Sequence, residues 1–305
     1  MLATQNPSAA SVAPPNFSLR DEIIFVLKAS RPGFWLTAIW FYLLPLAQQP
    51  VLRTFDFWFG VAFVSFAFGL FIYGWNDVGD VEDDKFNTRK GNFLFGARGT
   101  REQLRRLPWV ILVVHFACGA FMTWRYGTHV LWWYLALGVA TALYNWPRFG
   151  FKRWPVLDLL NQAGYLLVFD IGTLINSAPS THWTTMLFGV SFAMQSHLLG
   201  EILDLDADQL AGRRTSAILL GAVKSKFVLT AFLAWEAWLV WNFFGQRAVA
   251  VAFVAGAAWF VLDALCLFGS RAYPNWLTRF FLLGWNIVAL GTLPWVWSNA
   301  PFSPR

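Results

Sequence analysis

The sequence places a cluster of carboxylates where an apolar run ends. The stretch NDVGDVEDD follows directly on the run FWFGVAFVSFAFGLFIYGW. If the helix of this run continues, Asp77, Asp80 and Asp84 follow an i, i+3, i+7 pattern and share one of its faces. The other two acids of the stretch, Glu82 and Asp83, then point elsewhere, and we expect them to be solvated.

A second stretch, GEILDLDADQLAGRRT, repeats this spacing. Glu201, Asp204 and Asp208 are again three and then four residues apart, and they again lie where an apolar run ends. Carboxylates on two such faces repel one another, so a cation must lie between faces that meet. Mg²⁺ takes oxygen ligands and often bridges one or two carboxylates to phosphates. The two stretches therefore predict opposed acidic faces that hold Mg²⁺ ions around a diphosphate.

Basic residues follow both acidic stretches. Arg89 and Lys90 come after the first, and Arg213 and Arg214 come soon after the second. Arg makes bidentate contacts with phosphate, and Lys supplies a compact charge. Asn76, immediately before the first carboxylate, could be a neutral oxygen ligand or a diphosphate contact. We expect these five residues to bind the diphosphate.

Two other interpretations of the acids remain open. Either cluster alone could be a solvated helix end, although two copies with matched spacing favour a function. Intramembrane acids also serve ion and solute transporters, but transport does not require basic residues beside them. A transporter would move ions in liposomes without an allylic diphosphate, and it would release no pyrophosphate.

The elements that position these acids are apolar helices. The chain has 305 residues, is 57% hydrophobic and only 13% charged, and has a mean hydropathy of +0.48. A soluble domain carries about a quarter charged residues, and the apolar runs are too long and uniform for barrel strands. We therefore predict an all-α polytopic membrane protein with about nine transmembrane helices. The expected spans are residues 33–51, 56–76, 107–124, 128–146, 155–177, 182–202, 225–245, 248–269 and 276–298.

Basic residues are distributed unevenly around these spans. With a cytoplasmic N-terminus, most of the 23 Lys and Arg fall on one side of the membrane. The exceptions are Arg53, Arg125, Arg247 and Arg305. This excess places the basic side, which carries both acidic stretches, in the cytoplasm, with a bacterial-type inner or plasma membrane as the expected location. The net charge of +6 does not indicate a nucleic-acid partner, because the basic residues are dispersed over several loops.

The remaining chain suggests one domain. Residues 1–20 are expected to form a disordered tail, and residues 21–305 a single transmembrane domain. The start of the chain lacks the basic and apolar segments of a signal peptide. Cys118 and Cys266 fall within expected spans and indicate no disulfide framework.

The acidic stretches resemble the aspartate-rich motifs of the UbiA superfamily of intramembrane prenyltransferases. The pattern NDxxDxxxD, from Asn76 to Asp84, is similar to the first motif of that family. Asp204-x3-Asp208, with the glycine and basic residues that follow it, is similar to the second. The resemblance covers nearly the whole chain.

The resemblance implies a helical bundle around a central cavity. An allylic diphosphate lies on the cytoplasmic side, and its prenyl tail reaches the membrane lipid through a lateral opening. Mg²⁺ is the implied cofactor, and an allylic carbocation alkylates a lipophilic acceptor. In this scheme Asp77, Asp80 and Asp84 are assigned to one metal ion, and Asp204 and Asp208 to the other.

Five further residues gain roles from the resemblance and from their positions. The loop LYNWPRFGFKRWP is similar to a family segment after the fourth span, and it carries Tyr144 and Lys152. Lys152 is an expected diphosphate ligand. Tyr144, Asn161, His197 and Glu201 are expected to line the cavity, where His197 reaches the diphosphate, deprotonates an acceptor-derived cation or only hydrogen-bonds a neighbouring helix.

Three stretches resemble the lycopene elongase branch of the superfamily, which prenylates a C40 carotenoid. They are SRPGFWLTAIW, YGWNDVGDVEDDKFNTRKGN and FVLDALCLF. A carotenoid is therefore an expected acceptor, and the loop of residues 87–100 is an expected lid over the diphosphate. A terpene synthase or cyclase that uses no acceptor is the alternative within the same fold.

Overall fold

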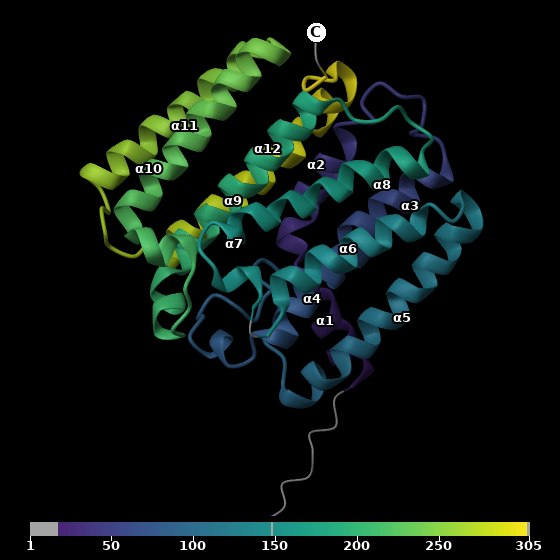
Figure 1. Cartoon of the computed structure of the whole chain (residues 1–305), viewed down its shortest axis with the longest axis horizontal. Coiled ribbons are helices and arrows are strands. Elements are labelled where there is room, and N and C mark those ends of the chain that lie inside the picture. Colours follow the sequence, from purple (N-terminus) through teal and green to yellow (C-terminus); the bar gives the residue numbers. More distant parts are fainter. Residues whose placement is uncertain (1–17, 148, 304–305) are drawn as a thin grey trace, which may run out of the picture.

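The structure, a computed structural model, describes residues 18–147 and 149–303. Within these ranges the chain is helical, and the long helices lie side by side along one common direction (Figure 1). The α-helices of the described chain are α1 (Leu19–Ala29), α2 (Trp35–Leu43), α3 (Phe55–Ala62), α4 (Phe68–Gly79), α5 (Arg101–Tyr126), α6 (Val130–Asn145), α7 (Leu157–Leu160), α8 (Leu167–Ile175), α9 (Trp183–Leu210), α10 (Ser216–Leu239), α11 (Arg247–Leu265) and α12 (Asn275–Asn299). The only β pairing in the described part is an isolated bridge. The all-α prediction is confirmed.

Six helices of the described chain are long and apolar enough to cross a membrane. They are Phe55–Gly79 (α3 and α4 joined by a π-helical turn), α5, α9, α10 with its π-helical extension to Phe244, α11 and α12. A bundle with this many apolar helices is an integral membrane protein, as the composition predicts.

The other three expected spans are shorter or interrupted. One is α6, a shorter apolar helix. Another is helical only as far as Leu43, because Pro45 has no N–H to continue the helical ladder. The third is divided into α7 and α8 by the 3₁₀ segment Asn161–Leu166. The number of spans and the side of the N-terminus therefore stay predictions.

Helix α1 lies partly where the sequence predicts a disordered tail. Ser18 and Asp21 form a capping box: the Ser18 side chain accepts the N–H of Asp21, and the Asp21 carboxylate accepts the N–H of Ser18. Residues 18–20 therefore begin a helix, and their assignment to the tail is wrong. The rest of the expected tail, residues 1–17, lies outside the described residues.

The core at the end of the bundle away from the two acidic stretches is aromatic. The buried rings of Phe41 and Phe169 stack with centroids 5.3 Å apart, and Phe188 stacks on Phe302 at 4.5 Å. Such pairs add about 0.5–1.5 kcal/mol each beyond burial. Phe188 precedes Asp204 by about 24 Å along α9, at the helical rise per residue. This core therefore fixes the helices at one end and leaves the other end to polar groups.

The loop of residues 87–99, which follows the first acidic stretch, is docked against the start of α2. The N–H of Gly33 donates to the carbonyl of Phe93 at 3.0 Å. A Cβ atom at Gly33 would lie 2.4 Å from the carbonyl oxygen of Leu94. Only glycine permits this approach, so the sequence at Gly33 helps to hold the loop beside the acidic residues.

Candidate active site

A cavity of about 520 Å³ lies inside the bundle. Charged residues line one end of it, and they include Asp80, Asp83, Asp84, Asp204, Asp208, Arg89, Lys90, Lys152 and Arg213. Phe41, Phe192 and Trp285 line its apolar part. A smaller cavity of about 140 Å³ shares Tyr144 and His197 with it. The cavity therefore joins a charged end to an aromatic chamber.

The first acidic stretch enters this cavity from the end of α4. The helix stops before Asp80, and the chain turns so that the N–H of Asp84 donates to the carbonyl of Asp80 at 2.8 Å. Both of these carboxylates line the cavity. Asp77 is buried behind them: its Oδ1 accepts Lys90 at 2.6 Å and Arg31 at 3.1 Å, and it does not line the cavity. The expectation of three aspartates on one continuous helical face is therefore wrong.

Asp83 belongs to the site, against the sequence-based expectation. Its Oδ2 accepts the Nε–H of Arg213 at 3.0 Å, and it lines the cavity. Glu82 is exposed and pairs only with Lys85 nearby, as expected for a solvated residue. The difference arises because the chain leaves the helix after Gly79, which turns the next side chains by an amount that helical periodicity does not give.

The three carboxylates of the second acidic stretch all lie on α9. Glu201, Asp204 and Asp208 all line the cavity, so the predicted shared face is present. Asp204 accepts Nδ2 of Asn87 at 3.0 Å. Glu201 turns instead toward α10, where its Oε2 accepts the N–H of Ala217 at 3.0 Å. Asp204 and Asp208 are thus the members of this set that face the first acidic stretch.

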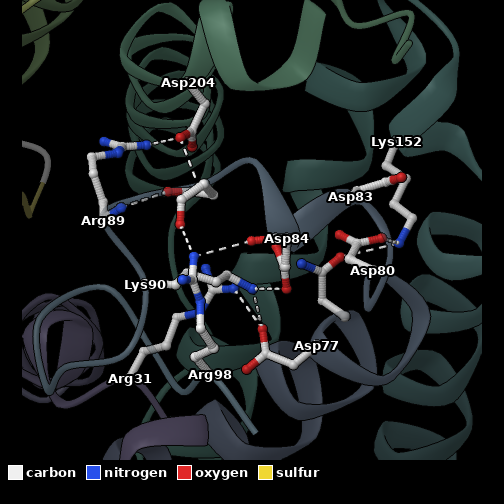
Figure 2. A network of polar contacts seen from close by, with 12 residues as sticks. Arg31, Asp77, Asp80, Asp83, Asp84, Arg89, Lys90, Arg98, Lys152 and Asp204 are labelled. Atoms are coloured by element: carbon white, nitrogen blue, oxygen red, sulfur yellow. Dashed lines mark hydrogen bonds and ion pairs between the residues drawn. The ribbon is translucent and has the colours of Figure 1, made fainter. Parts of the chain in front are cut away.

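Cations connect two acidic sets. The first set is formed by the aspartates of the first stretch (Asp77, Asp80, Asp83 and Asp84), and the second by Glu201, Asp204 and Asp208 of the second stretch. Arg213 contacts Asp80 at 2.7 Å and Asp208 at 3.4 Å. In the 87–99 loop, Arg89 pairs with Asp204 while the adjacent Lys90 pairs with the first set (Figure 2). Buried carboxylates are retained in proteins when they are paired in this way. The two sets therefore share one chamber, and its cations come from loops beyond the helix ends.

Lys152 is inserted into the first set from the loop after α6. Its ammonium donates to the carboxylate of Asp80 (Figure 2), to Oδ1 of Asn145 at 3.1 Å and to Oδ1 of Asn76 at 3.3 Å. Burial lowers the pKa of Lys152, and the charge of Asp80 opposes that shift. Asn76 and Lys152 thus lie together at the cavity wall, as expected for two groups that bind one ligand.

Asp80 and Asp84, the two aspartates of the first set on either side of its turn, differ in proton affinity. Burial alone would raise the pKa of Asp80, but Lys152 and Arg213 outweigh it and hold the pKa below the usual 3.8. Burial raises the pKa of Asp84 above 3.8, although Lys90 opposes the shift. Asp80 is therefore a firmly ionised carboxylate, whereas the ionised form of Asp84 would be stabilised more than that of Asp80 by an added cation.

The structure separates the remaining expected residues. Arg214 is exposed and does not line the cavity, so its expected diphosphate contact is not supported. Asn161 lines only the smaller cavity. Tyr144 and His197 line both cavities, and the Tyr144 hydroxyl lies 3.4 Å from Nε2 of His197.

Sequence reasoning missed two further site residues. Arg31 adopts a left-handed backbone (φ 50°), lies 4.6 Å over the ring of Tyr73 and pairs with Asp77. Asn87 binds Asp204. A basic residue directly before Pro-Gly at the start of an apolar run was the available signal for Arg31, since such a residue must lie at the membrane boundary.

The donor set fits Mg²⁺ by its chemistry. All the acidic groups at the cavity are carboxylates, which are hard oxygen donors, and they outnumber the cations paired with them. Asp77 Oδ2 is buried and has no hydrogen-bond partner among the described residues, which leaves it able to accept a further cation. In the described residues no group of three or more acidic, His or Cys side chains is gathered closely enough to hold a metal as it stands. Mg²⁺ at this site would therefore take water and phosphate oxygens beside one or two of these carboxylates.

The family model described as the UbiA prenyltransferase family matches residues 34–288. The chain belongs to the UbiA prenyltransferase family. This matched range contains both acidic sets and every residue that lines the cavity except Ser30 and Arg31. Membership confirms the predicted class of enzyme, a prenyltransferase. It also agrees with the integral membrane architecture.

Among curated relatives, a lycopene elongase/hydratase from Corynebacterium glutamicum is 26% identical over 292 residues, covering 89% of this chain and 98% of the relative. A lycopene elongase/hydratase from Halobacterium salinarum is 29% identical over 207 residues, covering 65% and 71%. Both carry the name of the branch that the sequence resembles.

Solved structures share the fold. A UbiA homologue from Archaeoglobus fulgidus bound to DMAPP and Mg²⁺ superposes with a TM-score of 0.62 at 18% identity, covering 88% of this chain and all of that one. The same homologue bound to GPP and Mg²⁺ gives a TM-score of 0.60 at 16% identity, covering 87% and 99%. The expectation of Mg²⁺ and an allylic diphosphate agrees with the ligands of these structures.

Proposed function

We propose that this UbiA-family enzyme transfers the prenyl group of an allylic diphosphate to a lipophilic polyene acceptor such as the carotenoid lycopene, in a reaction that requires Mg²⁺. The observation that carries the proposal is one cavity whose charged end is formed by both acidic sets and whose other part is aromatic. A diphosphate ester of a hydrocarbon likewise has a charged head, which suits the charged end, and an apolar tail, which suits the aromatic part. A carboxylate chamber that served only ion transport would not need the aromatic part.

Asp80 and Asp84 from the first set, and Asp204 and Asp208 from the second, are the residues that would hold the metal ions. They line the charged end of the cavity from two sides. Asp77 supports this set from behind with its unpartnered Oδ2. When bound there, Mg²⁺ supplies positive charge that stabilises the negative charge developing on the leaving diphosphate.

The diphosphate is bound by cations that already surround the carboxylates. Lys152 and Arg213 are fixed by contacts with Asp80, so their positions are organised before any ligand enters. Arg89 and Lys90 are carried by the 87–99 loop, and both line the same cavity as Asn76 and Lys152. Preorganised donors at a departing group account for much of the rate enhancement of many enzymes. These side chains would hold the diphosphate in place as the C–O bond breaks.

The apolar part of the cavity suits an allylic cation. Phe41, Phe192 and Trp285 present aromatic surface, and aromatic ring faces attract cations. The same side chains exclude water, which would otherwise capture the cation. The chamber thus supplies the dry, electron-rich surroundings in which the prenyl group and the acceptor can meet.

The orientation in the membrane follows from charge. The polar end of the cavity is built by the ends of α4 and α9 and by the loops that follow them, and these loops carry many of the basic residues. The positive-inside rule would place this end, with its diphosphate site, at the cytoplasmic surface. A water-soluble diphosphate head and a lipid-soluble tail could then enter from different phases.

A direct test uses protein in lipid nanodiscs with Mg²⁺, dimethylallyl or geranyl diphosphate, and lycopene. The expected result is release of pyrophosphate together with a product whose mass has increased by the prenyl group. Asp80→Asn and Asp208→Asn should lower turnover by ~10²-fold or more. Glu82→Gln is the matched control, since Glu82 is an exposed acid in the same stretch, and it should retain turnover.

Each other outcome excludes a stated function. Pyrophosphate release with a cyclised or hydrated product and no acceptor adduct would identify a terpene synthase. Ion flux in liposomes with no pyrophosphate release would identify a transporter. Turnover close to that of the unmodified enzyme in both aspartate variants would contradict the assignment of the acidic sets.

A further inference from the structure

Three polar side chains form a line from the cavity wall to the start of α10. The hydroxyl of Tyr144 lies 3.4 Å from Nε2 of His197, and the same nitrogen lies 3.3 Å from Oε1 of Glu201. Tyr144 and His197 pack edge to face with centroids 5.9 Å apart. All three residues line the cavity. The line therefore begins at the space that the substrates would occupy.

The far end of the line is held as a carboxylate. Oε2 of Glu201 accepts the N–H of Ala217, in the first turn of α10, at 3.0 Å. A helix N-terminus stabilises negative charge. The nearby acid Asp158 is held by Ser216, whose N–H and hydroxyl donate to its two oxygens, each at 2.6 Å. Glu201 is thus anchored through one oxygen, and its other oxygen faces His197.

That second oxygen accepts no hydrogen bond from the residues that the structure describes. Oε1 of Glu201 is buried and lies 3.3 Å from Nε2 of His197. A buried carboxylate oxygen without a donor is costly. If Nε2 gains a proton, the imidazole becomes a cation 3.3 Å from this oxygen, and the ion pair stabilises the buried negative charge. The arrangement of His197 and Glu201 therefore favours the uptake of one proton at Nε2.

The position along α9 suits the reacting carbons better than the diphosphate. His197 precedes Asp204 by about 10 Å at the helical rise, so it lies deeper in the cavity than the carboxylates assigned to metal. Tyr144 lines the smaller cavity together with Tyr165. The hydroxyl of Tyr165 is hydrogen-bonded to that of Tyr73 at 2.9 Å. Carbon atoms next to the departing diphosphate would occupy this part of the cavity.

We propose that Tyr144, His197 and Glu201 accept the proton that the acceptor loses after the prenyl group has been attached. This role rests on the proposed function. The allylic carbon loses diphosphate and forms a C–C bond with the π electrons of an acceptor double bond, which leaves a carbocation on the acceptor. A neighbouring C–H bond then breaks, and its electron pair forms a new double bond.

The proton passes to the hydroxyl oxygen of Tyr144 as that hydroxyl transfers its own proton to Nε2 of His197, and Glu201 stabilises the imidazolium. The balance is allylic diphosphate plus acceptor giving prenylated acceptor, diphosphate and one proton. The diphosphate product is the rival base. It is held by Lys152, Arg213 and metal ions, which lower its basicity, so His197 is the better acceptor in this cavity.

The test measures how the acceptor-derived cation partitions between proton loss and capture by water. His197→Gln and Glu201→Gln keep side-chain size, and glutamine at 201 still accepts the N–H of Ala217. Incubations contain the full-length variant in nanodiscs with Mg²⁺, dimethylallyl diphosphate and lycopene. Pyrophosphate release and the masses of the alkene and hydrated products are followed together, and thermal unfolding checks that each variant is folded.

The ratio of alkene to hydrated product is expected to fall by ~10-fold or more in both variants, in line with the loss of a general base, while pyrophosphate release persists. Tyr144→Phe should shift the ratio in the same direction. Glu236→Gln is the matched control: Glu236 is a fully buried acid of α10 with unpartnered oxygens that lines neither cavity, and it should leave the ratio unchanged.

Other outcomes overturn the proposal. An unchanged ratio in folded His197→Gln would assign proton removal to the diphosphate. A ratio that rises would mean that His197 activates water instead. Loss of pyrophosphate release would place these residues in the ionisation step. By contrast, failure of the unmodified enzyme to release pyrophosphate or to form any adduct would refute the proposed function itself.

Discussion

Nη2 of Arg213 lies 2.7 Å from Oδ2 of Asp80. Because Arg213 follows α9 and Asp80 follows α4, this ion pair joins the ends of two helices that are distant in the sequence. The same guanidinium also approaches Asp208 at 3.4 Å. One side chain therefore contacts both acidic sets, and the geometry of the chamber depends on it.

Replacement of Arg213 by glutamine should lower kcat/KM for the allylic diphosphate by ~10²-fold. The change removes a preorganised cation and leaves Asp80 and Asp83 with fewer partners, which should also lower the free energy of unfolding by about 2–4 kcal/mol. Pyrophosphate release and thermal unfolding in detergent measure the two effects. Arg214→Gln is the matched control, since Arg214 is exposed and outside the cavity. Equal effects of both variants would contradict the assignment.

Asp80 and Asp84 should affect the pH dependence of stability in opposite directions. The lowered pKa of Asp80 stabilises the fold above the usual value of 3.8, and this contribution is lost as the pH falls through the lowered value. The raised pKa of Asp84 means that the folded protein binds more protons than the unfolded chain just above 3.8, so stability falls as the pH rises through that window.

Thermal unfolding of the metal-free protein between about pH 3 and pH 6 tests this difference. Relative to the unmodified protein, Asp80→Asn should be destabilised at pH 6, and Asp84→Asn should be equally or more stable there. As the pH falls, the difference for Asp84→Asn should shrink down to about 3.8, whereas the difference for Asp80→Asn should shrink only below that value. A loss of stability of similar size in both variants at pH 6 would show that the two carboxylates have similar surroundings.

Gly33→Ala should disturb the 87–99 loop and thereby diphosphate binding. The added methyl group would lie 2.4 Å from the carbonyl oxygen of Leu94, so the loop that carries Arg89 and Lys90 must move. We expect a destabilisation of about 1–3 kcal/mol and a higher KM for the diphosphate. Gly284→Ala on α12 adds the same group to open space and should instead stabilise the helix by about 0.5–1 kcal/mol. Normal KM in Gly33→Ala would show that the loop is dispensable.

Ala193→Phe should restrict the length of the hydrocarbon that the cavity accepts. Ala193 lines the cavity about 16 Å along α9 from Asp204. A larger ring there should block a long prenyl chain or a carotenoid but leave ionisation of dimethylallyl diphosphate intact. Pyrophosphate release with diphosphates of increasing chain length measures this limit. Unaltered turnover of the longest substrate would mean that hydrocarbon does not pass Ala193.

Much of the site could be predicted because its chemistry is local in the sequence. The spacing of Asp204 and Asp208 survives intact, since α9 stays helical to Leu210. The spacing of the first set misled at Asp77 and Asp83, because α4 ends at Gly79 and the side chains after it no longer follow helical periodicity. Helix ends are decided by capping and by tertiary contacts such as that of Asp80 with Lys152.

The breaks in the helices could also not be predicted from the hydrophobic pattern. The 3₁₀ segment Asn161–Leu166 lies within an apolar run, and continuous hydrophobicity does not distinguish a straight helix from a broken one. Arg31 was missed for a related reason. Its partner Asp77 lies 46 residues away in the sequence, and only the packing of α1 and α4 brings the two together.

The central claim is that both acidic sets bind one metal–diphosphate group. The most direct measurement is the Mg²⁺-dependent affinity for an unreactive thiolo analogue of geranyl diphosphate, determined for the unmodified enzyme, Asp84→Asn, Asp208→Asn and the double variant. We predict that each single change weakens binding by ~10–100-fold and that the double change adds little more, since the ligand needs both sets at once. Binding of unmodified strength in either single variant would contradict the claim.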